Sequence, residues 1–202
     1  MAETEPFSVL FVCLGNICRS PAAEAVFTDL VRKRGAESKF KIDSAGTIAD
    51  PRMRAAAKRR GIDVTSISRP IRPSDFREFD LILAMDMRNR EDILSAYGRR
   101  RSKEPLPEDA SKKVKLMCSF CKKHNEAEVP DPYYGGPQGF EKVLDLLEDA
   151  CESLFDSIMA EKSQTSVSAA ELEVSILDRD LPWRLSIHEE SICNQNTVHG
   201  IR

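Results

Sequence analysis

Short apolar segments of strand length alternate with helix-length segments along the first 159 residues, and no other feature constrains the fold as strongly. The segments with the length and apolar content of strands are Ser8–Val12, Phe40–Ile42, Leu81–Met85 and Val114–Met117. Strands that alternate with helices usually pair with parallel neighbours through right-handed crossovers. The alternation therefore predicts an α/β fold with a doubly wound parallel sheet.

The segments between these strands carry helix signals. Ser20 and Pro21 are suited to the N-cap and the first position of a helix, and Gly35 is suited to its end. Shorter helices are expected over Arg52–Arg60, from a cap at Ser74, and over Arg88–Ala96. The longest helix is expected over Gln138–Met159, where apolar residues recur at helical spacing. That stripe consists of Phe140, Val143, Leu144, Leu147, Cys151, Leu154, Phe155 and Ile158.

Length and composition indicate one domain followed by a tail. A chain of 202 residues has room for about 1.3 average domains, so one core and an appendage are expected. From Ala160 onward the chain has seven acidic and four basic residues and a single aromatic, Trp183. We expect a domain over residues 1–159. The tail, residues 160–202, is expected to form at most a short helix near Ala169–Leu177 and otherwise to be disordered or loosely docked.

Charge and hydropathy exclude some partners. Thirty Lys+Arg and thirty-three Asp+Glu give a net charge of −3, which does not favour nucleic acid binding. No apolar run is long enough to span a membrane. The N-terminus is acidic, unlike a secretory or import leader, so a cytoplasmic protein with reduced cysteines is expected. Tyr97–His124 has a local net charge of +6, which fits either a solvated loop face or a docking surface for anionic partners.

The segment Cys13–Ser20 joins the first predicted strand to the first predicted helix, and it carries the chemistry. It has the form C-x5-R-S. Where a parallel strand leads into a helix N-terminus, backbone N–H groups and the helix dipole together bind anions. A thiol at Cys13 would be stabilised there as its nucleophilic thiolate, and Arg19 offers two parallel donors that match phosphoryl oxygens. The alternative is a buried cysteine that ends a strand before a capped helix.

The other loop residues have roles that suit such a site. Gly15 allows close backbone approach or positive φ. Asn16 can hold the loop by side-chain hydrogen bonds or adopt the left-handed conformation itself. Ser20 can donate a hydrogen bond to the thiolate.

Cys13–Ser20, together with Asp131-Pro132-Tyr133-Tyr134, resembles the low-molecular-weight protein tyrosine phosphatases, most closely their plant-type members. The resemblance covers about residues 7–159 and includes Asp43–Gly46 and Ala84–Asp86. It implies a four-stranded parallel sheet flanked by helices. It also implies a tyrosine and acid phosphatase that needs no metal or other cofactor and works through a phosphocysteine.

The resemblance assigns roles residue by residue. Cys13 is expected to be the nucleophile, Arg19 to clamp the phosphoryl oxygens, and Asp131 to act as general acid and then general base. The expected substrate-binding residues are Leu14, Gly15, Asn16, Ile17, Cys18, Ser20, Tyr133 and Tyr134. Expected substrates are phosphotyrosine proteins and small aryl phosphates, with phosphate and vanadate as inhibitors. The tyrosines are expected to flank the substrate ring and to be open to phosphorylation themselves. The oligomeric state is not indicated.

Two further features bear on the predicted active site: a second cysteine, Cys18, and a shortened segment after Gly46. In the family, a cysteine at the position of Cys18 forms a disulfide with the nucleophile and protects it from over-oxidation; a small residue facing the core is the alternative. Family members carry a longer segment after Gly46, with an aromatic that walls the substrate slot. In this chain only Thr47–Ala49 lie between Gly46 and Asp50, so several residues and the aromatic are missing. A shallower site with weaker discrimination for phosphotyrosine is therefore expected.

The sequence is also compatible with other functions. The chain could be an interaction module that binds phosphate groups without turnover. Arsenate reductases share the loop but use further cysteines, and Met85–Ala96 has none. Arginine phosphatases of the family have a smaller, polar residue where Ile17 stands. Cys118-x-x-Cys121-x-x-His124 could hold zinc, form a redox pair, or consist of ordinary loop cysteines.

Overall fold

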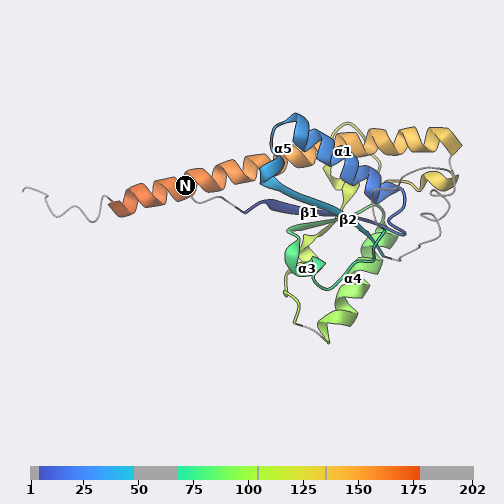
Figure 1. The fold of residues 1–202 in the computed structure, drawn as a ribbon, viewed down its shortest axis with the longest axis horizontal. Helices are drawn as coiled ribbons and strands as arrows, with labels where there is room; N and C mark the ends of the chain where they lie inside the picture. The colour runs from blue at the N-terminus through green and yellow to red at the C-terminus, as the bar shows by residue number, and fades with distance from the viewer. Residues whose placement is uncertain (1–4, 48–67, 104, 135, 178–202) are drawn as a thin grey trace, which may run out of the picture. The chain divides into compact units, whose positions relative to one another are not determined.

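A computed structural model describes residues 5–47, 68–103, 105–134 and 136–177 (Figure 1). The chain divides into two compact units, residues 1–159 and 160–202. Within the described ranges, none of the helices combines the length and apolar character that crossing a membrane requires.

The sheet has four strands, all parallel, as the sequence predicts. They are β1 (Phe7–Cys13), β2 (Phe40–Gly46), β3 (Leu81–Ala84) and β4 (Val114–Leu116), in the spatial order β2-β1-β3-β4. β1 is central and pairs on both sides, so its backbone polar groups are satisfied where water is excluded. The carboxyl ends of the strands meet at one edge, where parallel sheets bind ligands.

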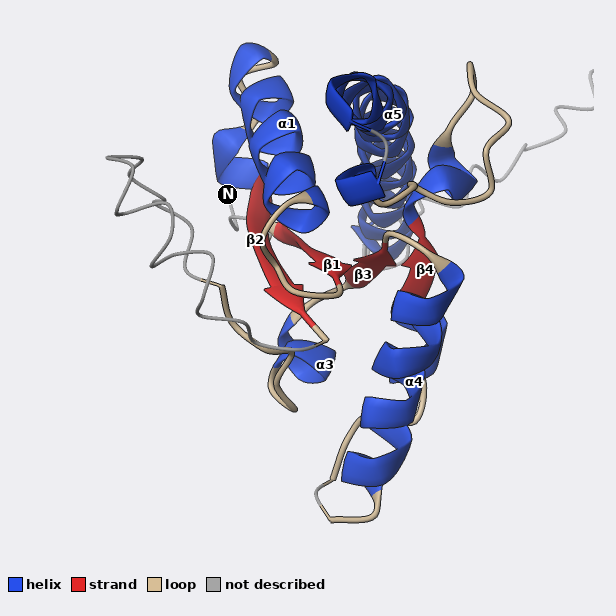
Figure 2. Cartoon of the chain, turned by 90° about the vertical axis from the view of Figure 1, so that its right-hand side faces the viewer, coloured by secondary structure: helices blue, strands red, loops and turns tan. Residues whose placement is uncertain are grey.

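Helices cover both faces of the sheet (Figure 2). α1 (Arg19–Lys33) and the part of α5 (Gly136–Leu177) up to Met159 lie on one side, and α3 (Asp75–Glu78) and α4 (Met87–Arg101) lie on the other. Short 3-10 turns are η1 (Glu37–Lys39), η2 (Ala110–Lys113), η3 (Met117–Phe120) and η4 (Pro132–Tyr134).

Each face of the sheet has its own hydrophobic cluster, and β1 supplies both. Val9, Phe11 and Cys13 are buried with the apolar residues of α1 and α5, whereas Leu10 and Val12 are buried with those of α3 and α4. Successive side chains of a strand point to opposite faces, so this assignment follows from the period of two. An uninterrupted apolar run is thus what a strand covered on both faces requires.

Three helices have boundaries that differ from the sequence predictions: α1, α5 and α4, which runs over Met87–Arg101 instead of the predicted Arg88–Ala96. α1 begins at Arg19 with Cys18 as its N-cap, so the prediction that Ser20 caps the helix is wrong. The Ser20 hydroxyl instead contacts Cys13. α5 is longer than the predicted helix at both ends, because it begins at Gly136 and continues to Leu177.

The remaining helix predictions have simpler outcomes. Gly35 follows α1 with a φ of 60°, which confirms it as the helix end. Ser74 is the N-cap of α3 but makes no side-chain cap bond. The helix expected over Arg52–Arg60 and the chain after Leu177 lie outside the described residues.

Asp149 on α5 holds the loop that follows η3. Its carboxylate accepts the backbone N–H groups of Lys122, Lys123 and His124 at 3.2, 2.9 and 3.0 Å, and it lies 2.9 Å from Nδ1 of His124. Burial alone would raise the pKa of this carboxyl group, but the hydrogen bonds from His124 and the backbone lower it to about 2. Asp149 therefore stabilises the fold in its ionised form.

Asp149→Asn is expected to lower the free energy of unfolding at pH 7 by about 1–2 kcal/mol, because the charged acceptor of four donors becomes a neutral amide. Since the folded pKa lies below the unfolded value of about 3.9, the wild-type advantage is present above pH 4. It is lost as the pH falls toward 2. Urea unfolding between pH 2 and 7 measures this difference.

Asp145→Asn is the matched control, because Asp145 is an exposed carboxylate on the same helix. Equal destabilisation by the two substitutions, or an Asp149 effect that is independent of pH, would contradict this account.

Candidate active site

The loop Leu14–Cys18 connects the last residue of β1 to the first turn of α1. Cys13 is buried, with 4% of its surface exposed. Asn16 has a φ of 52°, so it takes the left-handed conformation, and it also makes the side-chain hydrogen bonds expected of it. At Gly15 a Cβ atom would lie 3.0 Å from the Ile17 side chain, so a larger residue at this position would displace Ile17.

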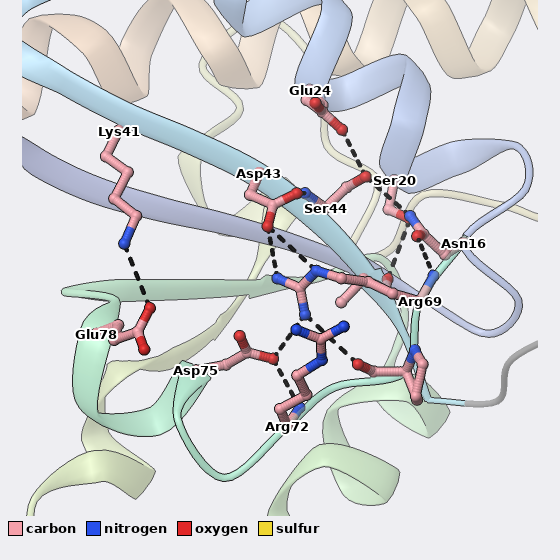
Figure 3. A network of polar contacts seen from close by, with 12 residues as sticks. Asn16, Ser20, Glu24, Lys41, Asp43, Ser44, Arg69, Arg72, Asp75 and Glu78 are labelled. Atoms are coloured by element: carbon pink, nitrogen blue, oxygen red, sulfur yellow. Dashed lines mark hydrogen bonds and ion pairs between the residues drawn. The ribbon is translucent and has the colours of Figure 1, made fainter. Parts of the chain in front are cut away.

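A chain of hydrogen bonds ends on the Cys13 sulfur. The Ser20 hydroxyl donates to Cys13 Sγ at 3.1 Å, and it also lies 3.2 Å from the carbonyl oxygen of Ala45. The Asn16 amide donates to the Oγ atoms of Ser20 and Ser44, at 3.0 and 2.8 Å. Figure 3 shows this part of the loop beside β2. A hydrogen-bond donor at the sulfur stabilises a thiolate more than a thiol.

The Arg19 guanidinium is held from two sides at the bottom of the loop. Its side chain is 6% exposed, and Nη1 donates to Asp86 Oδ2 at 2.6 Å and to the backbone carbonyl of Val129 at 3.0 Å. Asp86 also accepts the Asn89 N–H at 2.6 Å as the N-cap of α4. This cap cannot move without disturbing the arginine, so the direction of the guanidinium is fixed before any ligand binds.

Asp131 lies at the same site, although 118 residues separate it from Cys13. Its Oδ2 is 3.6 Å from Nη2 of Arg19, and its Oδ1 accepts the Tyr133 N–H at 3.1 Å. The side chain is 45% exposed, so the carboxyl group can exchange protons with water.

An apolar rim surrounds the entrance. Leu14, Ile17 and Tyr133 are exposed over 38%, 36% and 78% of their surfaces. Apolar side chains with this much contact with water suit an aromatic ligand. Two features that the sequence predicts lie outside the described residues. They are the side chain of Tyr134 and the part of the shortened connection that follows Thr47.

Cys13 and Cys18 are both free thiols. Cys18 is half-buried, and burial raises the pKa of its thiol, with further increases from the nearby Cys13 and Asp131. Arg19 lowers it in part. The second cysteine therefore favours its neutral form beside the first.

The cysteine and histidine motif lies away from this loop. The ring of His124 is occupied by Asp149, as described above, and Cys121 Sγ donates to the carbonyl of Leu146 at 3.6 Å. Burial raises the pKa of the Cys118 thiol to about 12. Among the residues that the structure describes, no three His, Cys, Asp or Glu side chains are grouped as metal ligands.

The structure brings Cys13, Arg19 and Asp131 together, with Gly15, Asn16, Ile17, Cys18 and Ser20 around them. Ser44, Arg69 and Asp86 had no predicted role, although Ser44 and Asp86 belong to segments that carry the family resemblance. Asp86 had a signal, because an acidic residue directly after a buried strand lies at the ligand-binding edge. Ser44 and Arg69 contact the loop through Asn16, which no local pattern indicates.

Comparisons with known proteins agree with this geometry. The family model "Low molecular weight phosphotyrosine protein phosphatase" matches residues 8–164. The Bacillus subtilis low molecular weight protein-tyrosine-phosphatase YfkJ is 40% identical over 163 residues, which cover 77% of this chain and 97% of that protein.

Two solved structures extend the comparison. A protein tyrosine phosphatase from Entamoeba histolytica, with Hepes in its active site, is 46% identical and has a TM-score of 0.63; the match covers 77% of this chain and 99% of the other. A Drosophila arginine phosphatase is 31% identical with a TM-score of 0.57, over 74% of this chain and 97% of the other. The chain thus belongs to the low molecular weight phosphotyrosine protein phosphatase family.

Proposed function

We propose that this chain hydrolyses phosphotyrosine in proteins and small aryl phosphates through a phosphocysteine on Cys13. The observation that carries the proposal is the convergence of a buried thiol, a fixed guanidinium and an exposed carboxyl group at one site. A nucleophile, an anion clamp and a proton donor are what hydrolysis of an aryl phosphate requires.

In the first step the Cys13 thiolate attacks phosphorus, and the bond between phosphorus and the aryl oxygen breaks. Asp131, protonated, gives its proton to that oxygen, so a neutral phenol leaves. Charge develops on the equatorial phosphoryl oxygens, which the loop N–H groups and Arg19 stabilise. Because Asp86 and Val129 already orient Arg19, little rearrangement accompanies this step.

In the second step water attacks the phosphocysteine. Asp131, now a carboxylate, accepts a proton from the water while the bond between phosphorus and sulfur breaks. The products are inorganic phosphate and the Cys13 thiolate, and Asp131 regains its proton, so the enzyme returns to its starting state. Inorganic phosphate and vanadate are expected to inhibit by occupying the same loop.

The entrance favours an aromatic phosphate ester over a cationic one. Ile17 gives the rim an apolar residue where the family's arginine phosphatases have a smaller, polar one. Leu14 and Tyr133 extend the same apolar surface. The likeness to the Drosophila arginine phosphatase therefore concerns the scaffold, and we assign the tyrosine-type substrate to this chain.

Cys13→Ser is expected to lower kcat for a chromogenic aryl phosphate by at least about 10³-fold, because a hydroxyl is a far weaker nucleophile at neutral pH. Asp131→Asn is expected to lower it by about 10²–10⁴-fold for phenols that leave poorly, and much less for phenols that leave well. Steady-state kinetics at pH 5–6 over a series of aryl phosphates measures both effects.

Cys121→Ser is the matched control, because this thiol lies away from the loop. Binding of vanadate by the wild-type chain without turnover of any aryl phosphate would instead identify an interaction module.

The short connection after Gly46 is expected to weaken selection for peptides. With less wall beside the ring, the ratio of kcat/KM for a phosphotyrosine peptide to that for p-nitrophenyl phosphate should be about tenfold lower than in a relative with the longer segment. Parallel kinetics on this chain and the Bacillus subtilis protein YfkJ provide the comparison. An equal or higher ratio in this chain would show that the deletion has no effect on selectivity.

A further inference from the structure

The segment Ser68–Arg72 runs beside the end of β2 and contacts the loop that contains the nucleophile. Gly46 and Pro70 form a parallel bridge: the Gly46 N–H donates to the Arg69 carbonyl at 2.8 Å, and the Ile71 N–H donates to the Gly46 carbonyl at 2.9 Å. We call this segment the brace.

Two hydrogen bonds connect the brace to the loop. Ser68 Oγ donates to the Gly15 carbonyl at 2.8 Å, and the Arg69 N–H donates to Asn16 Oδ1 at 3.1 Å. The second bond decides which way the Asn16 amide faces. Because its oxygen meets a donor, its nitrogen must point toward the two serine hydroxyls.

The Arg69 side chain fastens the brace to the domain. Its Nε and Nη2 lie 3.1 and 2.6 Å from Asp43 Oδ2 on β2, and its Nη1 lies 2.9 Å from Asp75 Oδ2 on α3 (Figure 3). Asp75 is almost fully buried, and the Arg69 side chain is 14% exposed. Burial would lower the pKa of Arg69, but the two carboxylates raise it. Arg69 is therefore a permanent cation between two anions.

The contacts form a continuous path from Arg69 to the sulfur. The Arg69 N–H sets the Asn16 amide, the amide nitrogen donates to Ser20 Oγ, and Ser20 Oγ donates to Cys13 Sγ. Since Ser20 Oγ accepts from Asn16, its own proton is left for an acceptor on the other side. An ionised sulfur is a stronger acceptor than the Ala45 carbonyl that also lies in reach.

We propose that Arg69 is a positioning residue for catalysis: it holds the brace so that Asn16 and Ser20 direct a proton at Cys13 and favour its thiolate. The proposal deepens the proposed function and rests on Cys13 being its nucleophile. Arg69 does not touch the substrate or the reacting atoms. Its effect reaches them through the backbone of the brace.

A purely structural role makes a different prediction. Loss of a buried ion pair that serves only stability would reduce the amount of folded protein at every pH. Loss of the hydrogen bond that stabilises the thiolate would move the pH dependence of the sulfur's reactivity in the protein that remains folded.

The test follows alkylation of Cys13 by iodoacetamide between pH 4 and 9, with the modified residue identified by peptide mass spectrometry. In Arg69→Ala we expect alkylation to be about tenfold slower at pH 6 than in the wild type, with the midpoint of the profile at higher pH. The profile of kcat/KM for p-nitrophenyl phosphate should move in the same direction. Arg69→Lys retains a cation but loses the planar guanidinium that contacts both carboxylates. Alkylation at pH 6 is therefore expected to slow about threefold.

Lys41→Ala is the matched control. Lys41 is a cation on β2 that pairs with Glu78 of α3 at 3.4 Å, and both side chains are about half exposed. Within the described residues it makes no hydrogen bond to the brace or to the loop, so both profiles should stay unchanged. Circular dichroism checks that each variant is folded. If Arg69→Ala is unfolded, Arg69→Lys carries the test.

A folded Arg69 variant whose alkylation profile superimposes on that of the wild type would overturn this proposal. A wild-type Cys13 that reacts no faster than glutathione would instead remove the proposed function. The two failures are thus separate results of one experiment.

Discussion

The ion pair between Arg19 and Asp86 connects the two halves of the domain at the point where a ligand would bind. Arg19 begins α1 on one face of the sheet, and Asp86 begins α4 on the other. The two residues follow β1 and β3, which are neighbouring strands, so their side chains meet at the carboxyl edge of the sheet. The contact orients the anion clamp, and the same carboxylate caps α4 through its other oxygen. The mostly buried pair is also charge-assisted and short, which favours one arrangement.

The fold was predictable because each strand and most helices carry local signals. The run Val9–Val12 indicates a strand, and Gly35 marks the end of α1. The position of Cys13 and Arg19 followed from the same reasoning, since a loop between a strand and a helix lies at the ligand-binding edge. Asp131 was different. Nothing in its neighbourhood distinguishes a catalytic acid from a turn, and only the resemblance to a family placed it at the site.

What the sequence did not indicate depends on tertiary contacts. Ser20 is a residue type that often caps helices, but its hydroxyl contacts the Cys13 sulfur, and the helix begins two residues earlier than predicted. No local pattern around Arg69 indicates that β2 and α3 bring two carboxylates to its side chain. α5 continues past Met159 to Leu177, beyond the apolar stripe that indicated the helix in the sequence.

The alternation of β1 side chains between the two faces of the sheet limits how the length of this strand can change. Cys13 belongs to the odd-numbered set Val9, Phe11 and Cys13, which faces α1 and α5. Side chains of a strand change sides with every residue, so the orientation of the sulfur depends on the parity of its distance from the strand's other buried positions. A change in the length of a connection outside the sheet leaves this orientation unchanged, but inside β1 only changes of two residues preserve which side the reactive atom occupies.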